Sequence, residues 1–142
     1  MPTRNASAVW EGGLQGGKGT FNGESGKIGG SYSFGSRFGD AGGTNPEELL
    51  AAAEAACYSM ALSLALEKAG APPQRVETRA ACTIEKQGEG FQITSMRLTV
   101  RAKAPGVSKD DFMKAAEATK DGCPVSKAFK GNLKFDLDAR LE

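Results

Sequence analysis

The strongest constraint on the fold is one long helical segment, residues 45–70, with a marked start and a marked end. Asn45 supplies an N-cap side chain, Pro46 takes the first helical position, and Glu48 stands where a capping box places its acid. Gly70 closes the segment, and two prolines follow shortly after it. The sequence therefore predicts a single long helix between these limits.

One broad face of this helix is predicted to be apolar, and it carries a cysteine. Cys57 lies mid-helix, so its own helix dipole does not activate it, and apolar surroundings raise the pKa of a thiol. Spacing alone favours a structural role for Cys57, and a nucleophilic role requires a cation brought to it. The residues assigned to this face are Leu49, Leu50, Ala53, Ala56, Cys57, Met60, Ala61 and Leu64.

The N-terminal third is rich in glycine, with 13 of the 19 glycines among the first 43 residues. Aromatic residues recur between these glycines, which predicts short strands and tight turns, with "NASAVWEG" and "KGTFNGES" as the first pair. Such strands bury little by themselves. They need something to pack on, such as a second subunit.

After the long helix, residues 76–85 and 91–104 predict a strand pair joined by the turn "KQGEG", with a bulge between Ile93 and Met96. Ser108 and Asp111 cap the next predicted helix, a short helix follows Cys123, and "NLKFDLDARLE" alternates as a last strand. No linker interrupts residues 1–142, which predicts a single domain. The order of elements predicts an α+β fold with antiparallel sheet.

The composition excludes several functions. The chain has no histidine, so a Cys–His or Ser–His pair and a His-containing zinc site are excluded, and the three cysteines lack metal-ligand spacing. The net charge of +1 gives no reason to expect nucleic acid or a membrane as partner. The N-terminus has no signal-peptide pattern, and "MALSLALEKAG" is too short to span a bilayer. A cytoplasmic location is expected, where cysteines serve redox chemistry more than structural disulfides.

The other cysteines and a glycine-rich loop give further candidates. Cys123 directly precedes Pro124, where a helix begins, and a helix N-terminus lowers the pKa of a thiol. Cys82 is interpreted as a small hydrophobic residue of a strand. "GGLQGGKGT" misses the phosphate-loop pattern, because Gly19 stands where Ser or Thr must bind magnesium.

Arg37 is the candidate cation, because an arginine is always charged and donates several hydrogen bonds at once. It lies in "YSFGSRFGD", predicted to be a compact aromatic loop. Local pattern alone also fits a solvated arginine. Glu47 and Glu48 fit helix-capping carboxylates, and one of them is a candidate for holding Arg37 in place.

Three stretches together resemble a known family: "RF" in the glycine-rich segment, "GTNPEELLAAAEAACYSMALS" and "GCPVSKAF". The chain is similar, from "VWEG" to its final strand, to the OsmC/Ohr family of thiol-dependent organic hydroperoxide reductases, and most of all to the OsmC branch. The resemblance implies an OsmC-like α+β fold. It also implies an intertwined homodimer whose antiparallel sheets are completed between subunits around a long central helix.

The resemblance also implies roles for four residues. Cys57 would be the peroxidatic cysteine and Cys123 the resolving one, with a disulfide formed between them. Arg37 would activate Cys57, and Glu47 would orient Arg37, whereas no role is assigned to Glu54. The implied substrate is an organic hydroperoxide and the implied reductant an external dithiol, with no metal, haem or flavin.

Two other function classes compete with this reading. One is a redox-sensing or small-ligand-binding module in which the same disulfide is regulatory and no turnover occurs. The other is an RNA-binding module that uses "GLQG" as a backbone clamp, which the near-neutral charge disfavours.

The position of Glu47 on the helix makes a prediction about subunits. In an unbroken helix it lies about 15 Å along the axis from Cys57 and about 80° around it. Glu47 therefore cannot sit beside the Cys57 of its own chain. We expect the arginine–carboxylate–thiolate cluster to contain residues of both subunits of a two-fold dimer.

Overall fold

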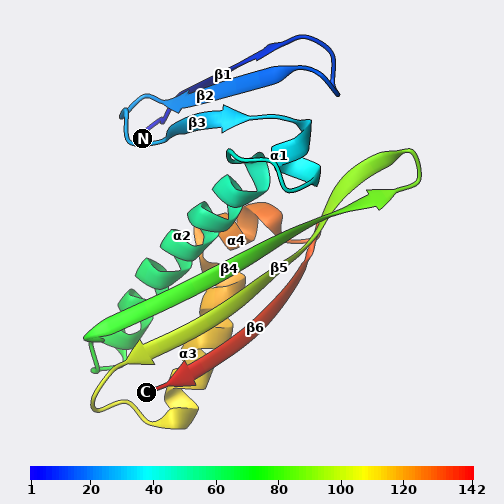
Figure 1. Cartoon of the computed structure of the whole chain (residues 1–142). Helices are drawn as coiled ribbons and strands as arrows, with labels where there is room; N and C mark the ends of the chain where they lie inside the picture. The colour runs from blue at the N-terminus through cyan, green and yellow to red at the C-terminus, as the bar shows by residue number, and fades with distance from the viewer. The chain divides into compact units, whose positions relative to one another are not determined.

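The computed structural model describes residues 1–142, and the chain forms two compact units, Met1–Glu48 and Leu49–Glu142. We call them the N-terminal and the C-terminal unit. The N-terminal unit contains a three-stranded antiparallel sheet in the order β1-β2-β3 (Figure 1). The strands are β1 (Ala6–Glu11), β2 (Lys18–Gly23) and β3 (Gly29–Tyr32), so the first predicted strand pair is confirmed.

Aromatic rings lie over a glycine on one face of this small sheet. The ring centroids of Trp10 and Tyr32 are 5.4 Å apart, and those of Phe21 and Tyr32 are 6.0 Å apart. A Cβ atom at Gly19 would meet the Tyr32 ring at 2.6 Å and the Trp10 ring at 2.7 Å. The glycine therefore leaves room for the rings to pack directly on the strand backbone.

The segment predicted to be an aromatic loop contains a short helix instead, α1 (Phe34–Phe38). Ser33 caps it, because the Ser33 hydroxyl accepts from the Ser36 N–H and the Ser36 hydroxyl accepts from the Ser33 N–H. This reciprocal pair is a capping box made by two serines, a variant that the usual Ser-to-Glu pattern does not reveal. The helix gives Arg37 a defined backbone position.

The long helix, α2 (Pro46–Lys68), has the predicted ends. The Asn45 side chain accepts from the Glu48 N–H at 2.8 Å, while the Glu48 carboxylate accepts from the Thr44 hydroxyl. At the C-terminus Gly70 has a φ of +83°, and the Ala71 N–H donates to the Leu66 carbonyl at 2.9 Å. This is the hydrogen bond of a Schellman ending, for which glycine is the favoured residue.

The predicted apolar face of α2 is not the face buried by the chain itself. Tyr58, Leu62 and Leu66 are fully buried, whereas Met60 and Leu64 are 72% and 51% exposed. The helix is rich in apolar residues all round, so periodicity does not select one stripe. Packing against the sheet determines which face of α2 is buried. The face that carries Met60 and Leu64, called here the uncovered stripe, stays exposed within the chain.

The C-terminal unit holds the second sheet, in the order β4-β5-β6 (Figure 1). Its strands are β4 (Arg75–Gln87), β5 (Gly90–Lys103) and β6 (Lys134–Leu141). Thr83 pairs with Ser95 and Ile84 with Ile93, so Thr94 is the extra residue of the predicted bulge. The predicted helices α3 (Lys109–Gly122), capped by Ser108, and α4 (Pro124–Phe129) are also present.

The prediction of purely antiparallel sheets is wrong for the last strand. β4 and β5 are antiparallel, but β6 runs parallel to β5, with Ser95 opposite Lys134 and Ala102 opposite Leu141. Helices α3 and α4 connect β5 to β6, and such a crossover lets the following strand run in the same direction. Alternation along one strand does not reveal its direction relative to a neighbour.

The core of the C-terminal unit lies between this sheet and the helices. Every second residue of β5 from Met96 to Ala102 points inward and is fully buried. These side chains pack with Tyr58 and Leu62 of α2 and with Phe112 of α3. Burial of each large apolar side chain contributes about 1.5–3 kcal/mol, so this cluster holds α2 and α3 against the sheet.

Helix α2 has the length and composition to cross a membrane, with a mean hydropathy of 1.6 over an 18-residue window. The expectation that the apolar stretch is too short considered only residues 60–70, and the helix has 23 residues. The core helix of a globular unit meets the same criteria, and α2 contributes Tyr58, Leu62 and Leu66 to a core. Length and composition therefore do not assign it to a membrane.

Candidate active site

The N-terminal unit brings Arg37 and Glu47 together. Arg37 Nε donates to Glu47 Oε1 at 3.0 Å and to Oε2 at 3.2 Å, and Nη2 donates to Oε1 at 2.7 Å. Glu47 is buried, whereas the Arg37 side chain is 35% exposed. The Nη1 group makes no hydrogen bond within the chain, so Arg37 keeps donors for another anion while Glu47 holds it.

Aromatic side chains surround this arginine. The Arg37 Cζ atom lies 5.3 Å from the centre of the Phe38 ring, and the Phe34 and Phe38 rings are 4.9 Å apart. A cavity of about 290 Å³ opens here, and its walls include Trp10, Tyr32 and Arg37. The aromatic walls limit the positions open to the guanidinium and leave it facing an apolar hollow.

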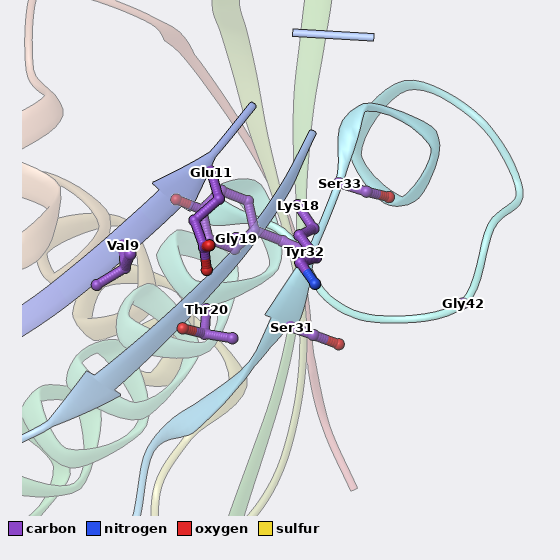
Figure 2. A pocket seen from close by; sticks show the side chains of 9 residues that line it. All are labelled: Val9, Glu11, Lys18, Gly19, Thr20, Ser31, Tyr32, Ser33 and Gly42. Atoms are coloured by element: carbon purple, nitrogen blue, oxygen red, sulfur yellow. The ribbon is translucent and has the colours of Figure 1, made fainter. Parts of the chain in front are cut away.

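A second hollow of the N-terminal unit, of about 380 Å³, lies over the small sheet (Figure 2). Figure 2 shows the side chains of Glu11 and Lys18 beside those of Thr20 and Ser31, which come from all three strands. This hollow has no thiol and none of the four predicted site residues. No chemistry is assigned to it.

In the C-terminal unit, Cys57 is half-buried at the edge of the uncovered stripe of α2. A cavity of about 490 Å³ opens beside it, with Met60, Leu64 and Glu67 of α2 and Pro124 of α4 among its walls. The Cys57 thiol therefore faces a largely apolar hollow that also reaches the start of α4.

Cys123 is buried at the N-cap of α4, where the Ser126 N–H donates to its sulfur at 3.4 Å. The Ser126 hydroxyl lies 3.0 Å from the same sulfur. The Cys57 side chain is one of the groups that raise the pKa of Cys123, and Cys57 lines one cavity together with Pro124, the residue that follows Cys123. Two cysteines 66 positions apart in the sequence are thus neighbours in the fold, and neither is in a disulfide.

The expectation of a lowered pKa at Cys123 is wrong. Burial of the thiol raises its pKa above the ordinary value. Hydrogen bonding with Ser126 acts in the opposite direction, whereas Cys57 and the negative charge of Glu54 raise the pKa further. The helix N-terminus does contact the sulfur as predicted, but desolvation outweighs its effect.

The structure adds a residue to which the sequence assigned no role. Glu54 is fully buried, and its Oε1 accepts from the Ser126 hydroxyl at 2.5 Å and from the Cys123 thiol at 3.7 Å. Its Oε2 atom is buried without any hydrogen-bond partner. The signal in the sequence was a lone acid inside an alanine run, on a helix whose neighbouring positions are apolar.

Comparison with known proteins agrees with the resemblance drawn from the motifs. The model of the OsmC-like protein family matches residues 39–138. Peroxiredoxin OsmC of Escherichia coli K12 is 42% identical over 138 residues, which are 96% of each chain. The chain belongs to the OsmC family. The organic hydroperoxide resistance protein OhrA of Bacillus subtilis is 33% identical to the chain over 96 residues, which are 67% of this chain and 66% of its own.

Solved structures of the OsmC family share the fold. An organic hydroperoxide resistance protein of Elizabethkingia anophelis superposes with a TM-score of 0.74 at 25% identity, covering 100% of this chain and 98% of its own. The OsmC-like α+β fold with two small sheets and a long helix is therefore confirmed. In this OsmC-family chain the structure pairs Arg37 with Glu47, and it places Cys57 on a cavity that also reaches Pro124, next to Cys123.

Proposed function

We propose that the chain is a cysteine-based peroxidase that reduces organic hydroperoxides to alcohols. The names of its relatives support a peroxidase-type role. The observation that carries the finer proposal is the placement of Cys57 on an apolar cavity with the buried Cys123 thiol as its neighbour. A reactive thiol beside a second thiol is the arrangement that a disulfide-forming catalytic cycle requires.

In the first step the Cys57 thiolate attacks one oxygen of the hydroperoxide. The O–O bond breaks, the sulfur keeps that oxygen as a sulfenic acid, and the other oxygen takes a proton and leaves as the alcohol. The apolar walls beside Cys57, Met60 and Leu64, favour a hydroperoxide with an organic chain over hydrogen peroxide.

In the second step Cys123 attacks the sulfenic sulfur of Cys57. A disulfide forms and water leaves, and an external dithiol then restores both thiols by exchange. The cycle proposed here uses thiols throughout, so it requires no metal, haem or flavin. The dithiol supplies both electrons that the hydroperoxide consumes.

Arg37 is proposed to stabilise the Cys57 thiolate and the charge that develops on the leaving oxygen. Its bidentate pairing with Glu47 supports this, because the pairing orients the guanidinium and leaves Nη1 available. Glu47 is proposed as the positioning residue. Since Glu47 is far along α2 from its own Cys57, we propose that Arg37 and Glu47 of one subunit serve Cys57 of the other.

A homodimer gives the uncovered stripe of α2 a partner. Met60 and Leu64 are exposed within the chain, and small alanine and serine residues around them permit close approach of a second helix. We propose that two copies pack on this stripe, that their sheets are completed between subunits, and that residues 1–142 function there as one OsmC-like domain in the cytoplasm.

A panel of hydroperoxides with stopped-flow detection tests the proposal. Wild-type protein with a dithiol should turn over cumene hydroperoxide repeatedly, and faster than hydrogen peroxide. Cys57→Ser should lose this activity, whereas Cys82→Ser, in the same unit, should keep it. Retention of most activity by Cys57→Ser would show that the assignment of the nucleophile is wrong.

The redox-sensing module remains the second candidate, because the same two thiols suffice for a regulatory disulfide. It predicts one oxidation per chain and no sustained turnover in the presence of dithiol. Counting alcohol formed per protein chain separates the two functions.

A further inference from the structure

We infer that Glu54 is the proton acceptor for the Cys123 thiol when Cys123 attacks the oxidised Cys57. This inference rests on the proposed function, and it adds a residue to the proposed chemistry. It assigns Glu54 to the resolving step alone and not to the reaction of Cys57 with peroxide.

The contacts of Glu54 support this role directly. Its Oε1 accepts from the Cys123 thiol at 3.7 Å and from the Ser126 hydroxyl at 2.5 Å. The Ser126 hydroxyl is itself 3.0 Å from the Cys123 sulfur. The carboxylate, the hydroxyl and the thiol therefore form a closed triangle at the N-terminus of α4.

The second carboxylate oxygen gives an independent indication. Glu54 is fully buried, and Oε2 has no hydrogen-bond partner. A buried acceptor without a partner destabilises the folded chain, so each one in a native structure calls for an explanation. No lysine or arginine forms an ion pair with Glu54.

The Ser126 hydroxyl has one proton to donate, and this limits the routes by which the thiol proton can reach the Glu54 carboxylate. Because the Ser126 hydroxyl donates to Glu54, its contact with Cys123 has the thiol as donor. The proton therefore moves either straight to Glu54 Oε1 or through the Ser126 oxygen, which passes its own proton on. Both routes end at the same carboxylate oxygen.

The chemistry of the resolving step requires an acceptor at this place. Burial raises the pKa of Cys123, so its thiol is protonated at neutral pH, and a thiol is a much weaker nucleophile than a thiolate. As the new S–S bond forms, the S–O bond of the Cys57 sulfenic acid breaks. The Cys123 proton passes to Glu54 and then to the departing hydroxide, so water leaves and the carboxylate is restored.

The titratable neighbours of this cluster are few. Cys57 and Tyr58 face it from α2, Cys123 lies at the start of α4, and Glu117 of α3 acts on Tyr58. The Tyr58 hydroxyl donates to the Ala116 carbonyl, and burial holds its pKa above the ordinary range. Tyr58 therefore stays neutral at physiological pH, which leaves Glu54 as the only carboxylate in contact with the Cys123 thiol.

Quenched-flow measurement of the two steps tests the inference. Reduced protein is mixed with one equivalent of cumene hydroperoxide, and quenched samples are assayed by mass spectrometry for dimedone-trapped Cys57 and for the Cys57–Cys123 disulfide. Glu54→Gln keeps the shape and removes the base. Glu117→Gln is the matched control, because it removes a glutamate charge on α3 outside contact with Cys123.

Oxidation of Cys57 should be unchanged in Glu54→Gln, while disulfide formation at neutral pH should slow by about 100-fold or more. The residual rate should rise with pH, following ionisation of Cys123, whereas the wild-type rate should not. Loss of the Glu54 charge lowers the pKa of Cys123, so a purely electrostatic role predicts faster disulfide formation instead. The two roles therefore give changes of opposite sign.

Disulfide formation in Glu54→Gln within threefold of wild type, with the same pH profile, would overturn the inference. If that variant does not fold, Glu54→Asp keeps the carboxylate and should retain the wild-type pH profile at a reduced rate. A wild-type disulfide step without a solvent deuterium isotope effect would equally overturn it. Absence of any Cys57 oxidation in the wild type would instead refute the proposed function.

Discussion

Replacement of Arg37 by lysine tests the proposed activation of Cys57. The guanidinium makes three hydrogen bonds to Glu47 through Nε and Nη2 and keeps Nη1 for a thiolate or peroxide. A lysine has one ammonium group, which must serve both Glu47 and the reacting atoms. Charge is kept in Arg37→Lys, so any loss reports on geometry.

The hydrogen bonds of Arg37 determine how much of the Cys57 oxidation rate Arg37→Lys is expected to lose. At least one charge-assisted hydrogen bond is lost, worth about 1.5–3 kcal/mol, and about 1.4 kcal/mol corresponds to a tenfold change in rate. Because the Arg37 side chain is 35% exposed, solvent screens part of this interaction. We therefore expect the rate constant of Cys57 oxidation to fall about 10- to 30-fold in Arg37→Lys.

Stopped-flow oxidation of Cys57 by cumene hydroperoxide measures this rate constant. The matched control is Arg101→Lys, in which an arginine that pairs with Asp138 in the C-terminal unit receives the same substitution. It should react as the wild type does. A rate constant within threefold of wild type for Arg37→Lys, together with unchanged pH dependence of Cys57 alkylation in Arg37→Ala, would refute the proposed role of Arg37.

Three further outcomes are expected. Cys123→Ser should react once with peroxide, give a Cys57 sulfenic acid that dimedone traps, and then over-oxidise without turnover; an unchanged turnover number would contradict the resolving role. Inactive Cys57→Ser and Glu47→Ala chains, mixed and allowed to exchange, should regain about a quarter of wild-type activity, because half of the dimers are mixed and each has one complete site; confirmed exchange without recovery excludes a shared site. Met60→Lys combined with Leu64→Lys should convert the dimer to monomer in sedimentation equilibrium, since both side chains are exposed within the chain; a stable dimer of this variant places the interface elsewhere.

Local signals in the sequence were sufficient for most of the helices and strands. The N-cap at Asn45 and the left-handed ending at Gly70 depend on residues that are neighbours along the chain, and both appear as predicted. The bulge at Thr94 was visible because an extra residue shifts the alternation of a strand. The family motifs indicate Cys57 and Cys123 as a pair, and the structure places Cys57 on a cavity that reaches Pro124, next to Cys123.

Tertiary structure decided what depends on partners distant in the sequence. The direction of β6 follows from its pairing with β5, and the buried face of α2 follows from the sheet, because the helix itself is apolar on several sides. The thiol of Cys123 illustrates the same principle. The position of Cys123 at the start of a helix predicted a lowered pKa. Burial of the thiol raises the pKa instead, and no local pattern in the sequence reveals that burial.

Glu54 shows most clearly what local sequence patterns do not predict. In the sequence it is one acid among alanines, and local rules would place it on a solvated face. Packing of α2 buries it and brings it to Ser126 and Cys123, which come from α4, about 70 positions later in the chain. A side chain acquires such a role from the atoms that surround it in space, and these are set by packing between elements, whereas the sequence by itself determined the ends of α2, which depend on neighbouring residues alone.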